Sequence, residues 1–514
     1  MIHTRRHEHG VALQRRPRPV MAVAIGLDDE PLFGPAEVDL QALHHGVHPR
    51  SRDRAARAHK LRFERVRPPR YPQPTVKRFH VTTFGCQMNE HDSERMKGML
   101  ESLGYAEVPD RRDADLILFN TCSIREKADE RFVQHLYEAR ALKRRDPERV
   151  IGVGGCWAQS VKEQVFRDYP FVDVAFGPGQ VHRLAEFLTS DSLTAQGYFE
   201  FEGFTGHLPG KRARDFQAWV QISAGCNMRC SFCIVPSTRG REVSRPLEEL
   251  VDEVRGLAAE GVREVTLLGQ NVNSYGIRLR PRPRKFSELL YAVAAIDGID
   301  RIRYTSPHPA HMSEDVVRAH AELPSLCEHI HLPLQSGSSR VLKRMRRTYD
   351  RRRYLERVAL IREHVPDCAL TTDIIVGFPG ETEADFAETL AVVEEVGFDG
   401  AFTFIYSPRR ETEAATFTDD FIDHDVQVER MERLVEVVQR RARERAQRFV
   451  GRTLGVLVEG ASRHDPTRLR GRTTHNKVVN FDGLGEPGEI VPVTITAATS
   501  QTLSGESSLL SRAA

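Results

Sequence analysis

The stretch Cys226-Asn-Met-Arg-Cys230-Ser-Phe-Cys233 gathers three of the chain's eight cysteines in one short segment. Three thiols cannot all pair with one another in disulfides, but their thiolates can hold one face of an iron–sulfur cluster. A four-iron cube normally takes four cysteine ligands, so a cube held by three keeps one iron open to a ligand that is not protein. A zinc site, the alternative, needs a fourth ligand at close spacing, and no His or Cys follows nearby. The stretch therefore predicts an iron–sulfur site.

Length and composition limit what the rest of the chain can be. With 514 residues we expect about three or four domains. The 74 basic and 72 acidic residues nearly cancel, so a nucleic-acid surface has to be a local patch. No apolar run reaches the roughly 18 residues of a membrane span, and no signal peptide is evident. Eight thinly spread cysteines favour reduced thiols and metal binding, hence a cytoplasmic protein, over a disulfide framework.

Residues 1–76 differ from everything that follows. They contain no Cys, many Arg and Pro, and 7 of the 21 His. No long periodic segment occurs there, so we expect a basic, disordered extension. An unused upstream start codon and an RNA-tethering arm are the alternatives.

From Arg78 onward, short apolar runs alternate with helical patterns, which predicts a parallel sheet with right-handed crossovers over residues 77–193. The expected strands are 79–84, 116–119, 150–153 and 172–176, and the expected helices are 92–103, 127–142 and 181–188.

Cys86, Cys122 and Cys156 each follow one of these strands. A single cysteine there would usually be a small buried hydrophobe. Ligands of open α/β sheets gather at the carboxyl ends of the strands, so three such cysteines should converge in space. We infer a second cluster with three protein ligands.

A connector is expected over 190–216, and a second α/β region over 212–445. Its six expected strands are 219–223, 264–268, 302–305, 330–334, 371–376 and 402–406. Its expected helices include 246–259, 286–294, 351–365 and 384–396. Six βα units, not eight, predict a partial (β/α)6 barrel. The Cys226 stretch follows its first strand, at the end where barrel enzymes place their sites.

A long amphipathic helix over 428–449 should follow, with its Arg-rich face in solvent. Short β-type runs at 454–458, 477–481 and 490–495 then predict a small antiparallel β-barrel over 448–511. The cations between Arg468 and Lys477, together with Phe481, could bind phosphates and stack on a base. A merely solvated surface is the alternative.

Several motifs together resemble the methylthiotransferases of the radical S-adenosylmethionine (SAM) superfamily over about residues 77–510, ending in an RNA-binding TRAM domain. They are Thr83-Phe-Gly-Cys86-Gln-Met-Asn, Asn120-Thr-Cys122-Ser-Ile-Arg-Glu-Lys, Gly154-Gly-Cys156, Gly225-Cys226 through Cys233-Ile-Val-Pro, Leu267-Leu-Gly-Gln-Asn-Val-Asn-Ser-Tyr, Arg303-Tyr-Thr-Ser-Pro-His-Pro, Leu332-Pro-Leu-Gln-Ser-Gly-Ser and Asp373-Ile-Ile-Val-Gly-Phe-Pro-Gly-Glu-Thr. Trp157 departs from the pattern, where a smaller apolar residue is expected.

The resemblance implies an enzyme that methylthiolates C2 of N6-(dimethylallyl)adenosine beside the anticodon in tRNA. It implies two [4Fe-4S] clusters: one on Cys226, Cys230 and Cys233 that cleaves SAM to a radical, and an auxiliary one on Cys86, Cys122 and Cys156 that delivers sulfur. A second SAM would supply the methyl group. The sister branches act on threonylcarbamoyladenosine in tRNA or on a ribosomal protein. A non-catalytic, redox-sensing RNA-binding protein is the rival from another class.

The resemblance also implies the contacts and partners of the site. Phe232 should contact the adenine of SAM, and Gly269, Gln270 and Asn271 its amino group. Weaker expectations place Gln335, Ser336 and the turn at Gly377 near the ribose and adenine, where ordinary turn residues are the alternative. No catalytic side chain beyond the cluster ligands is implied. A flavodoxin-type electron donor, a monomeric state and no membrane contact are expected, with Cys327 and Cys368 as buried thiols.

Overall fold

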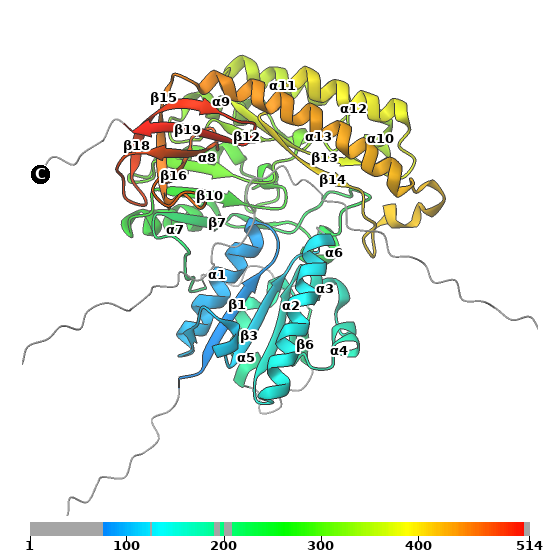
Figure 1. Cartoon of the computed structure of the whole chain (residues 1–514), viewed down its shortest axis with the longest axis vertical. Coiled ribbons are helices and arrows are strands. Elements are labelled where there is room, and N and C mark those ends of the chain that lie inside the picture. Colours follow the sequence, from blue (N-terminus) through cyan, green and yellow to red (C-terminus); the bar gives the residue numbers. More distant parts are fainter. Residues whose placement is uncertain (1–75, 124–125, 190–195, 200–207, 508–514) are drawn as a thin grey trace, which may run out of the picture.

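The computed structural model describes residues 76–123, 126–189, 196–199 and 208–507, so the expected extension lies outside it except for its last residue. The described chain forms an α/β domain, a larger barrel-like α/β region and a small β-barrel (Figure 1). No helix in these ranges is both long enough and apolar enough to cross a bilayer.

The first domain is built on a six-stranded parallel sheet in the order β2-β1-β3-β4-β5-β6. Its strands are β1 (Arg78–Thr83), β2 (Ala106–Glu107), β3 (Leu116–Thr121), β4 (Val150–Gly155), β5 (Val174–Phe176) and β6 (Gln196–Tyr198). Its helices are α1 (Gln87–Ser102), η1 (Arg111–Asp113), α2 (Glu126–Arg145), α3 (Cys156–Val161), α4 (Gln164–Asp168), η2 (Pro178–Arg183) and α5 (Leu184–Thr189). The four predicted strands are present. The prediction of a plain connector over 190–216 is wrong at β6, which pairs with β5 as an edge strand.

Two separate apolar cores cover the two faces of this sheet. Met96 and Leu100 of α1 and Phe187 of α5 pack on one face, and Phe132 and Leu136 of α2 pack on the other. The chain runs from β1 outward to β2 and then returns to β3 on the opposite side of β1. The carboxyl ends of β1 and β3 therefore flank a topological switch point, where open α/β sheets bind ligands.

The central region contains six parallel strands in two three-stranded sheets, β11-β10-β7 and β12-β13-β14. The strands are β7 (Gln217–Gln221), β10 (Glu264–Leu268), β11 (Arg301–Tyr304), β12 (His329–His331), β13 (Ala369–Val376) and β14 (Gly400–Ile405). A single bridge from Ile302 to Leu326 joins the two halves. The six-stranded partial barrel is thus confirmed, with a seam between β11 and β12. A short hairpin, β8 (Ser223–Ala224) with β9 (Val243–Ser244), follows β7.

Helices cover the outside of these strands (Figure 1). The helical segments of this part of the chain, including short ones in its loops, are α6 (Val235–Arg239), α7 (Leu247–Ala259), η3 (Val272–Ser274), α8 (Phe286–Ala294), η4 (Pro309–His311), α9 (Glu314–Glu322), α10 (Ser339–Arg344), α11 (Arg351–His364), α12 (Glu383–Val396), η5 (Glu413–Thr416), η6 (Thr418–Asp420), α13 (His424–Ala446) and η7 (Gln447–Phe449).

Helix α13 buries the predicted stripe, including Leu434 and Val438, against the strands. The expectation that its arginines face only solvent is wrong. Arg440 pairs with Glu394 of α12, and Arg448, in η7 at the end of the predicted helix, lies 2.6 Å from Asp399, whose side chain is fully buried. These ion pairs form because the opposite face of α13 lies over neighbouring carboxylates.

The small barrel closes in the order β15-β16-β17-β19-β18. Its strands are β15 (Thr453–Ala461), β16 (Leu469–Thr473), β17 (Val478–Asp482), β18 (Ile490–Ala498) and β19 (Thr502–Ser507). The prediction of a wholly antiparallel barrel is wrong at one pair, because β17 and β19 run parallel. Phe481 is fully buried in the barrel core, so it cannot stack on a base as expected.

The small barrel docks on the amino-terminal ends of the central strands. Arg301, the first residue of β11, donates to the carbonyls of Arg472 and Gly455 at 2.7 and 2.9 Å. Arg303 donates to the carbonyl of Thr473 at 2.8 Å. The opposite, carboxyl-terminal ends of the central strands remain available for the cysteine site.

Candidate active site

The first three predicted cysteines lie at the carboxyl ends of β1, β3 and β4. Cys86 caps α1, Cys122 follows β3 directly, and Cys156 is the first residue of α3. A Cβ at Gly85 would lie 2.7 Å from the Cβ of Cys122, which places the Cys86 segment against Cys122. Burial raises the pKa of Cys156, and the nearby Cys86 adds to the shift. The structure therefore brings these three cysteines into one neighbourhood, as expected from the sequence.

A glycine precedes two of these cysteines for a steric reason. Gly155 has φ +96°, and a Cβ there would lie 2.4 Å from the carbonyl oxygen of Thr121. Gly85 has φ +133°, with the contact to Cys122 described above. Side chains rarely adopt such φ angles, so only glycine lets the strands deliver both cysteines this closely.

Cys226, Cys230 and Cys233 occupy the loop after β8, at the carboxyl end of the central strands. Burial raises the pKa of Cys226 to about 11 and of Cys233 to about 12, and both thiols feel the charge of Cys230. Bound iron would deprotonate such thiols, because a metal ion outweighs the desolvation of a thiolate. In the described ranges no three His, Cys, Asp or Glu side chains converge on a single ion.

The residues expected to meet SAM lie beside this triplet. Gly269, Gln270 and Asn271 follow β10. The Oε1 of Gln270 and the Oγ of Ser223 are buried and lack a hydrogen-bond partner in this structure, and a Cβ at Gly269 would lie 2.6 Å from that Oγ. Buried polar atoms are normally hydrogen-bonded. Two open oxygens at the ends of β7 and β10 fit a polar ligand group such as an ammonium.

Phe232 comes from the loop after β8 but packs against the β12-β13-β14 half of the barrel, where the weaker candidates lie. The ring of Phe232 packs against Phe378 with centroids 6.4 Å apart. Gln335, at φ +67°, donates from its N–H to the Asp373 carbonyl at 2.8 Å. Ser336 is fully buried. All three remain candidates for contact with SAM.

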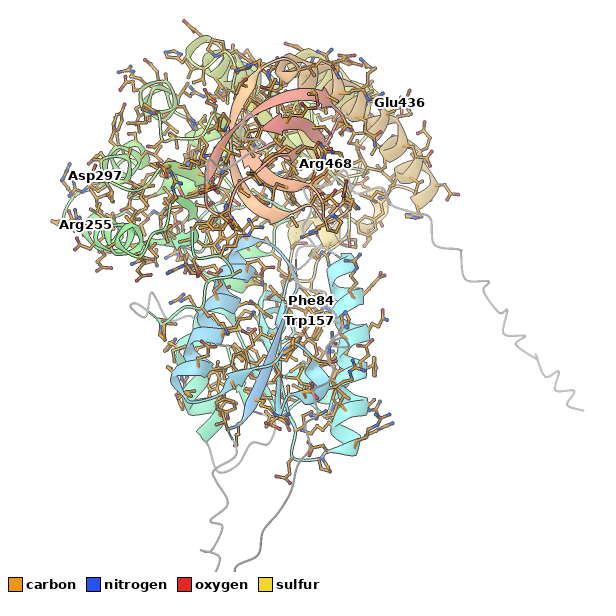
Figure 2. The ribbon with its side chains drawn as sticks, turned by 60° about the vertical axis from the view of Figure 1, so that its left-hand side comes forward. Phe84, Trp157, Arg255, Asp297, Glu436 and Arg468 are labelled. Carbon is orange, nitrogen blue, oxygen red and sulfur yellow. The ribbon has the colours of Figure 1, made fainter. Side chains whose placement is uncertain are left out.

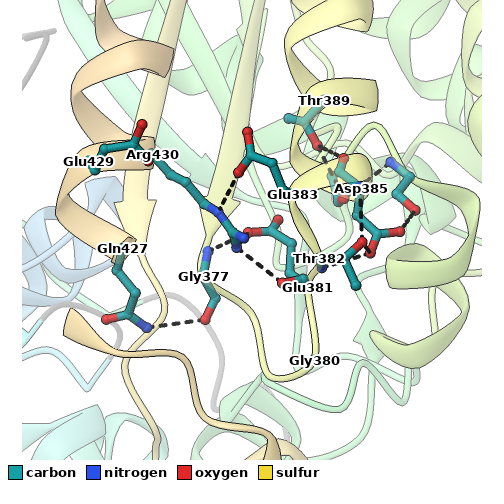
Figure 3. A network of polar contacts seen from close by, with 12 residues as sticks. Gly377, Gly380, Glu381, Thr382, Glu383, Asp385, Thr389, Gln427, Glu429 and Arg430 are labelled. Atoms are coloured by element: carbon teal, nitrogen blue, oxygen red, sulfur yellow. Dashed lines mark hydrogen bonds and ion pairs between the residues drawn. The ribbon is translucent and has the colours of Figure 1, made fainter. Parts of the chain in front are cut away.

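The turn at Gly377 is held on two sides by side chains (Figure 3). Its N–H donates to Oε2 of Glu381 at 2.8 Å, and its carbonyl accepts from Gln427 at 3.2 Å. Arg430 in turn lies 3.0 Å from the same Glu381 carboxylate. The turn is therefore a braced element whose backbone groups already have partners.

Trp157 lies in the first domain, as does Phe84 (Figure 2). Its ring packs edge-on against Phe132, with centroids 4.9 Å apart, in the core under α2. This unexpected side chain thus points into an apolar core. Cys327 and Cys368 are buried, as predicted.

Sequence reasoning missed two arginines that contact predicted cluster ligands. Nε of Arg239 lies 3.3 Å from Sγ of Cys156, and Nη1 of Arg347 lies 3.2 Å from Sγ of Cys230. Neither belongs to a cysteine motif. The only available signal was the position of Arg239 in the helical segment that follows Cys233.

The fold and its cysteine loop define a radical SAM protein, and family models agree. The radical SAM superfamily model matches residues 220–393, the uncharacterized protein family UPF0004 matches 78–177, and the TRAM domain matches 447–507. A solved structure of the radical SAM methyltransferase TsrM from Kitasatospora setae, with cobalamin and a [4Fe-4S] cluster bound, has a TM-score of 0.49 at 14% identity, covering 66% of this chain and 77% of that one.

Curated relatives give the particular family. The tRNA-2-methylthio-N(6)-dimethylallyladenosine synthase of Acidothermus cellulolyticus is 47% identical over 442 residues, which is 84% of this chain and 88% of the relative. The synthase of the same name from Frankia alni is 46% identical over 448 residues, 85% of this chain and 90% of the relative. The chain belongs to the family of tRNA-2-methylthio-N(6)-dimethylallyladenosine synthases.

Proposed function

We propose that this protein methylthiolates C2 of N6-(dimethylallyl)adenosine next to the anticodon in tRNA. The observation that carries the proposal is the identity of about 45% to synthases of this name across all three described domains. The C2–H bond is not acidic, so its replacement needs the one-electron chemistry that iron–sulfur clusters and SAM supply when bound.

Two sets of three cysteines are proposed to hold two [4Fe-4S] clusters. Cys226, Cys230 and Cys233 would hold the cluster that binds SAM, and Cys86, Cys122 and Cys156 the auxiliary one. Three protein ligands in each set leave an iron for a non-protein ligand. Consumption of two SAM molecules per product belongs to the same proposal.

The remaining residues orient the reactants and exclude water. Phe232 is proposed to pack against the adenine of SAM, and Gly269, Gln270 and Asn271 to meet its amino group. The unpartnered buried oxygens of Gln270 and Ser223 support this placement.

The proposal also covers domains and partners. It assigns 77–193 to the auxiliary-cluster domain, 212–445 to the radical SAM core and 448–511 to the RNA-binding domain. Residues 508–511 lie outside the described ranges. A flavodoxin-type electron donor, a monomeric state and a cytoplasmic location complete it, since tRNA is the substrate.

Mass spectrometry of tRNA nucleosides tests the assignment in a host that lacks its own enzyme. The 2-methylthio form of the dimethylallyl nucleoside should appear only when this protein is expressed. Unmodified dimethylallyladenosine, together with SAM cleavage by the purified protein, would move the substrate to a sister branch. Absence of SAM cleavage in the reconstituted protein would favour a non-catalytic role.

Alanine variants separate the two cysteine sets. Variants at Cys226, Cys230 or Cys233 should lose SAM cleavage. Variants at 86, 122 or 156 should keep SAM cleavage but give no methylthio product. The matched control is Cys368→Ala, a buried thiol outside both sets, which should retain both activities. Loss of SAM cleavage in the whole second set, with the first cluster spectroscopically intact, would overturn this division.

A further inference from the structure

Arg239 links the two cysteine sites across the domain boundary. It ends α6, the short helix that begins just after Cys233, and α6 packs against α3 of the first domain. Its Nε lies 3.3 Å from Sγ of Cys156, and its Nη2 lies 2.7 Å from Oδ2 of Asp92. The side chains of Arg239 and Asp92 are only 7% and 3% exposed.

The position of Asp92 makes this contact more than a chance approach. Asp92 belongs to α1, the helix that Cys86 caps, while Cys156 begins α3. Arg239 therefore contacts both α1 and α3, the two helices that start at proposed auxiliary ligands. Burial alone would lower the pKa of Arg239, but Asp92, Cys156 and Cys86 raise it, so the guanidinium stays charged.

A buried cation that donates to a ligand sulfur has a known physical consequence. Hydrogen bonds to the sulfurs and the net charge nearby set the reduction potential of an iron–sulfur cluster. Hydrogen bonds with a charged partner are also the stronger ones. A positive charge at this sulfur should favour the reduced cluster, and the carboxylate of Asp92 should oppose that effect.

We propose that Arg239 is a positioning residue of the auxiliary cluster, which holds the Cys156 sulfur and raises the cluster's reduction potential, with Asp92 as the opposing charge. This inference rests on the proposed ligation by Cys86, Cys122 and Cys156. Arg239 lies in the radical SAM core, so a residue of one domain would tune a cluster held by the other domain.

The auxiliary potential can be measured by itself in full-length protein that carries Cys→Ala at 226, 230 and 233. In this background, an EPR-monitored redox titration of the reconstituted protein should show a more negative midpoint for Arg239→Met. At a fixed potential near the midpoint of the parent protein, the ratio of reduced to oxidised cluster should fall about tenfold in Arg239→Met, because a charge-assisted hydrogen bond is lost. Arg239→Lys, which keeps the charge, should shift less.

Asp92→Asn provides the decisive second variant, because it should move the midpoint in the opposite, positive direction. A merely structural strut would not produce shifts of opposite sign. Arg347→Met is the matched control: in the unaltered protein its guanidinium contacts Cys230 of the other site, whose thiol is absent from this background, so the auxiliary midpoint should stay in place. If Arg239→Met fails to load iron, Arg239→Lys and Asp92→Asn still decide the question.

Two failures are distinguishable. If the protein with the three alanines takes up no cluster at all, the proposed auxiliary ligation is wrong. If that cluster forms but its midpoint is the same in Arg239→Met and Asp92→Asn, or moves in the same direction in both, the ligation stands and the role of Arg239 is refuted.

Discussion

Replacing Glu459 should loosen the small C-terminal barrel from the rest of the protein. Glu459 lies on β15, and its side chain is 4% exposed. Its carboxylate lies 3.1 Å from Arg472, 3.5 Å from Arg470 and 3.4 Å from Arg214. Arg214 precedes β7, so this buried carboxylate joins the barrel to the central region.

The expected magnitude follows from the shifted pKa. Burial would raise the pKa of Glu459, but Arg472, Arg214 and Arg470 lower it to about 2 from its ordinary 4.5. At about 1.4 kcal/mol per pKa unit, this carboxylate stabilises the fold by about 3 kcal/mol. Because the folded pKa is depressed, the stabilisation is present above about pH 4.5 and is lost as the pH falls toward 2. Removing one partner of a buried ion pair costs about 3–5 kcal/mol, which agrees with the value from the pKa.

Hydrogen exchange measured by mass spectrometry can detect this local loss. We expect the amides of β15 and β16 to exchange through unfolding of the barrel itself. At pH 7, Glu459→Gln should then speed their exchange about a hundredfold. The control is Asp482→Asn: Asp482 pairs with Arg468 but is 58% exposed, so its loss should cost less than about 1 kcal/mol. Unchanged protection in Glu459→Gln would refute the assigned role.

Three further changes test other parts of the fold. Gly155→Ala should cost at least about 2 kcal/mol, because φ +96° and the 2.4 Å approach to a carbonyl of β3 both disfavour a side chain; iron analysis should show loss of the proposed auxiliary cluster alone. Arg303→Met removes donors to the small barrel, and limited proteolysis should then release that barrel faster. Arg430→Met leaves Glu381 buried without its cation; because burial already raises the pKa of Glu381 to about 7, thermal melting should show a loss of stability that grows as the pH rises above 7, up to about 3 kcal/mol.

The sequence predicted the elements whose apolar pattern is local. The strands before Cys122 and Cys156 begin with apolar runs, and the strand before Cys86 contains Phe79 and Val81, so their order along the chain already indicated a parallel sheet with the cysteines at one edge. Strands β2 and β6 have two and three residues. Segments this short carry no readable periodicity, so their pairing at the sheet edges could not be predicted.

The roles of the cations could not be predicted, because their partners are remote in sequence. Arg214 and Glu459 are 245 positions apart, and Arg239 and Asp92 are 147 apart. The basic segment from Arg468 to Lys477 illustrates the consequence. Arg472 pairs with Glu459, and the Lys477 ammonium donates to the Asp399 carbonyl at 2.7 Å. Composition identified cations that suit RNA, whereas the structure uses Arg472 in an ion pair within the small barrel and Lys477 in a contact with the central region.

Two contact surfaces, one at each end of the central strands, determine how the three domains are arranged. The small barrel occupies the amino-terminal ends of the central strands through Arg301 and Arg303. The first domain meets the carboxyl-terminal ends, where Arg95 of α1 lies 3.3 Å from Gln221 at the end of β7. Both cysteine sets lie at carboxyl ends of parallel strands, and α6, which follows Cys233, reaches Cys156 through Arg239, so the two sets lie on the same side of this contact. If both proposed clusters are present, the distance between them depends on interface side chains such as Arg239, so changes that remove the charge there should alter the chemistry without unfolding either domain.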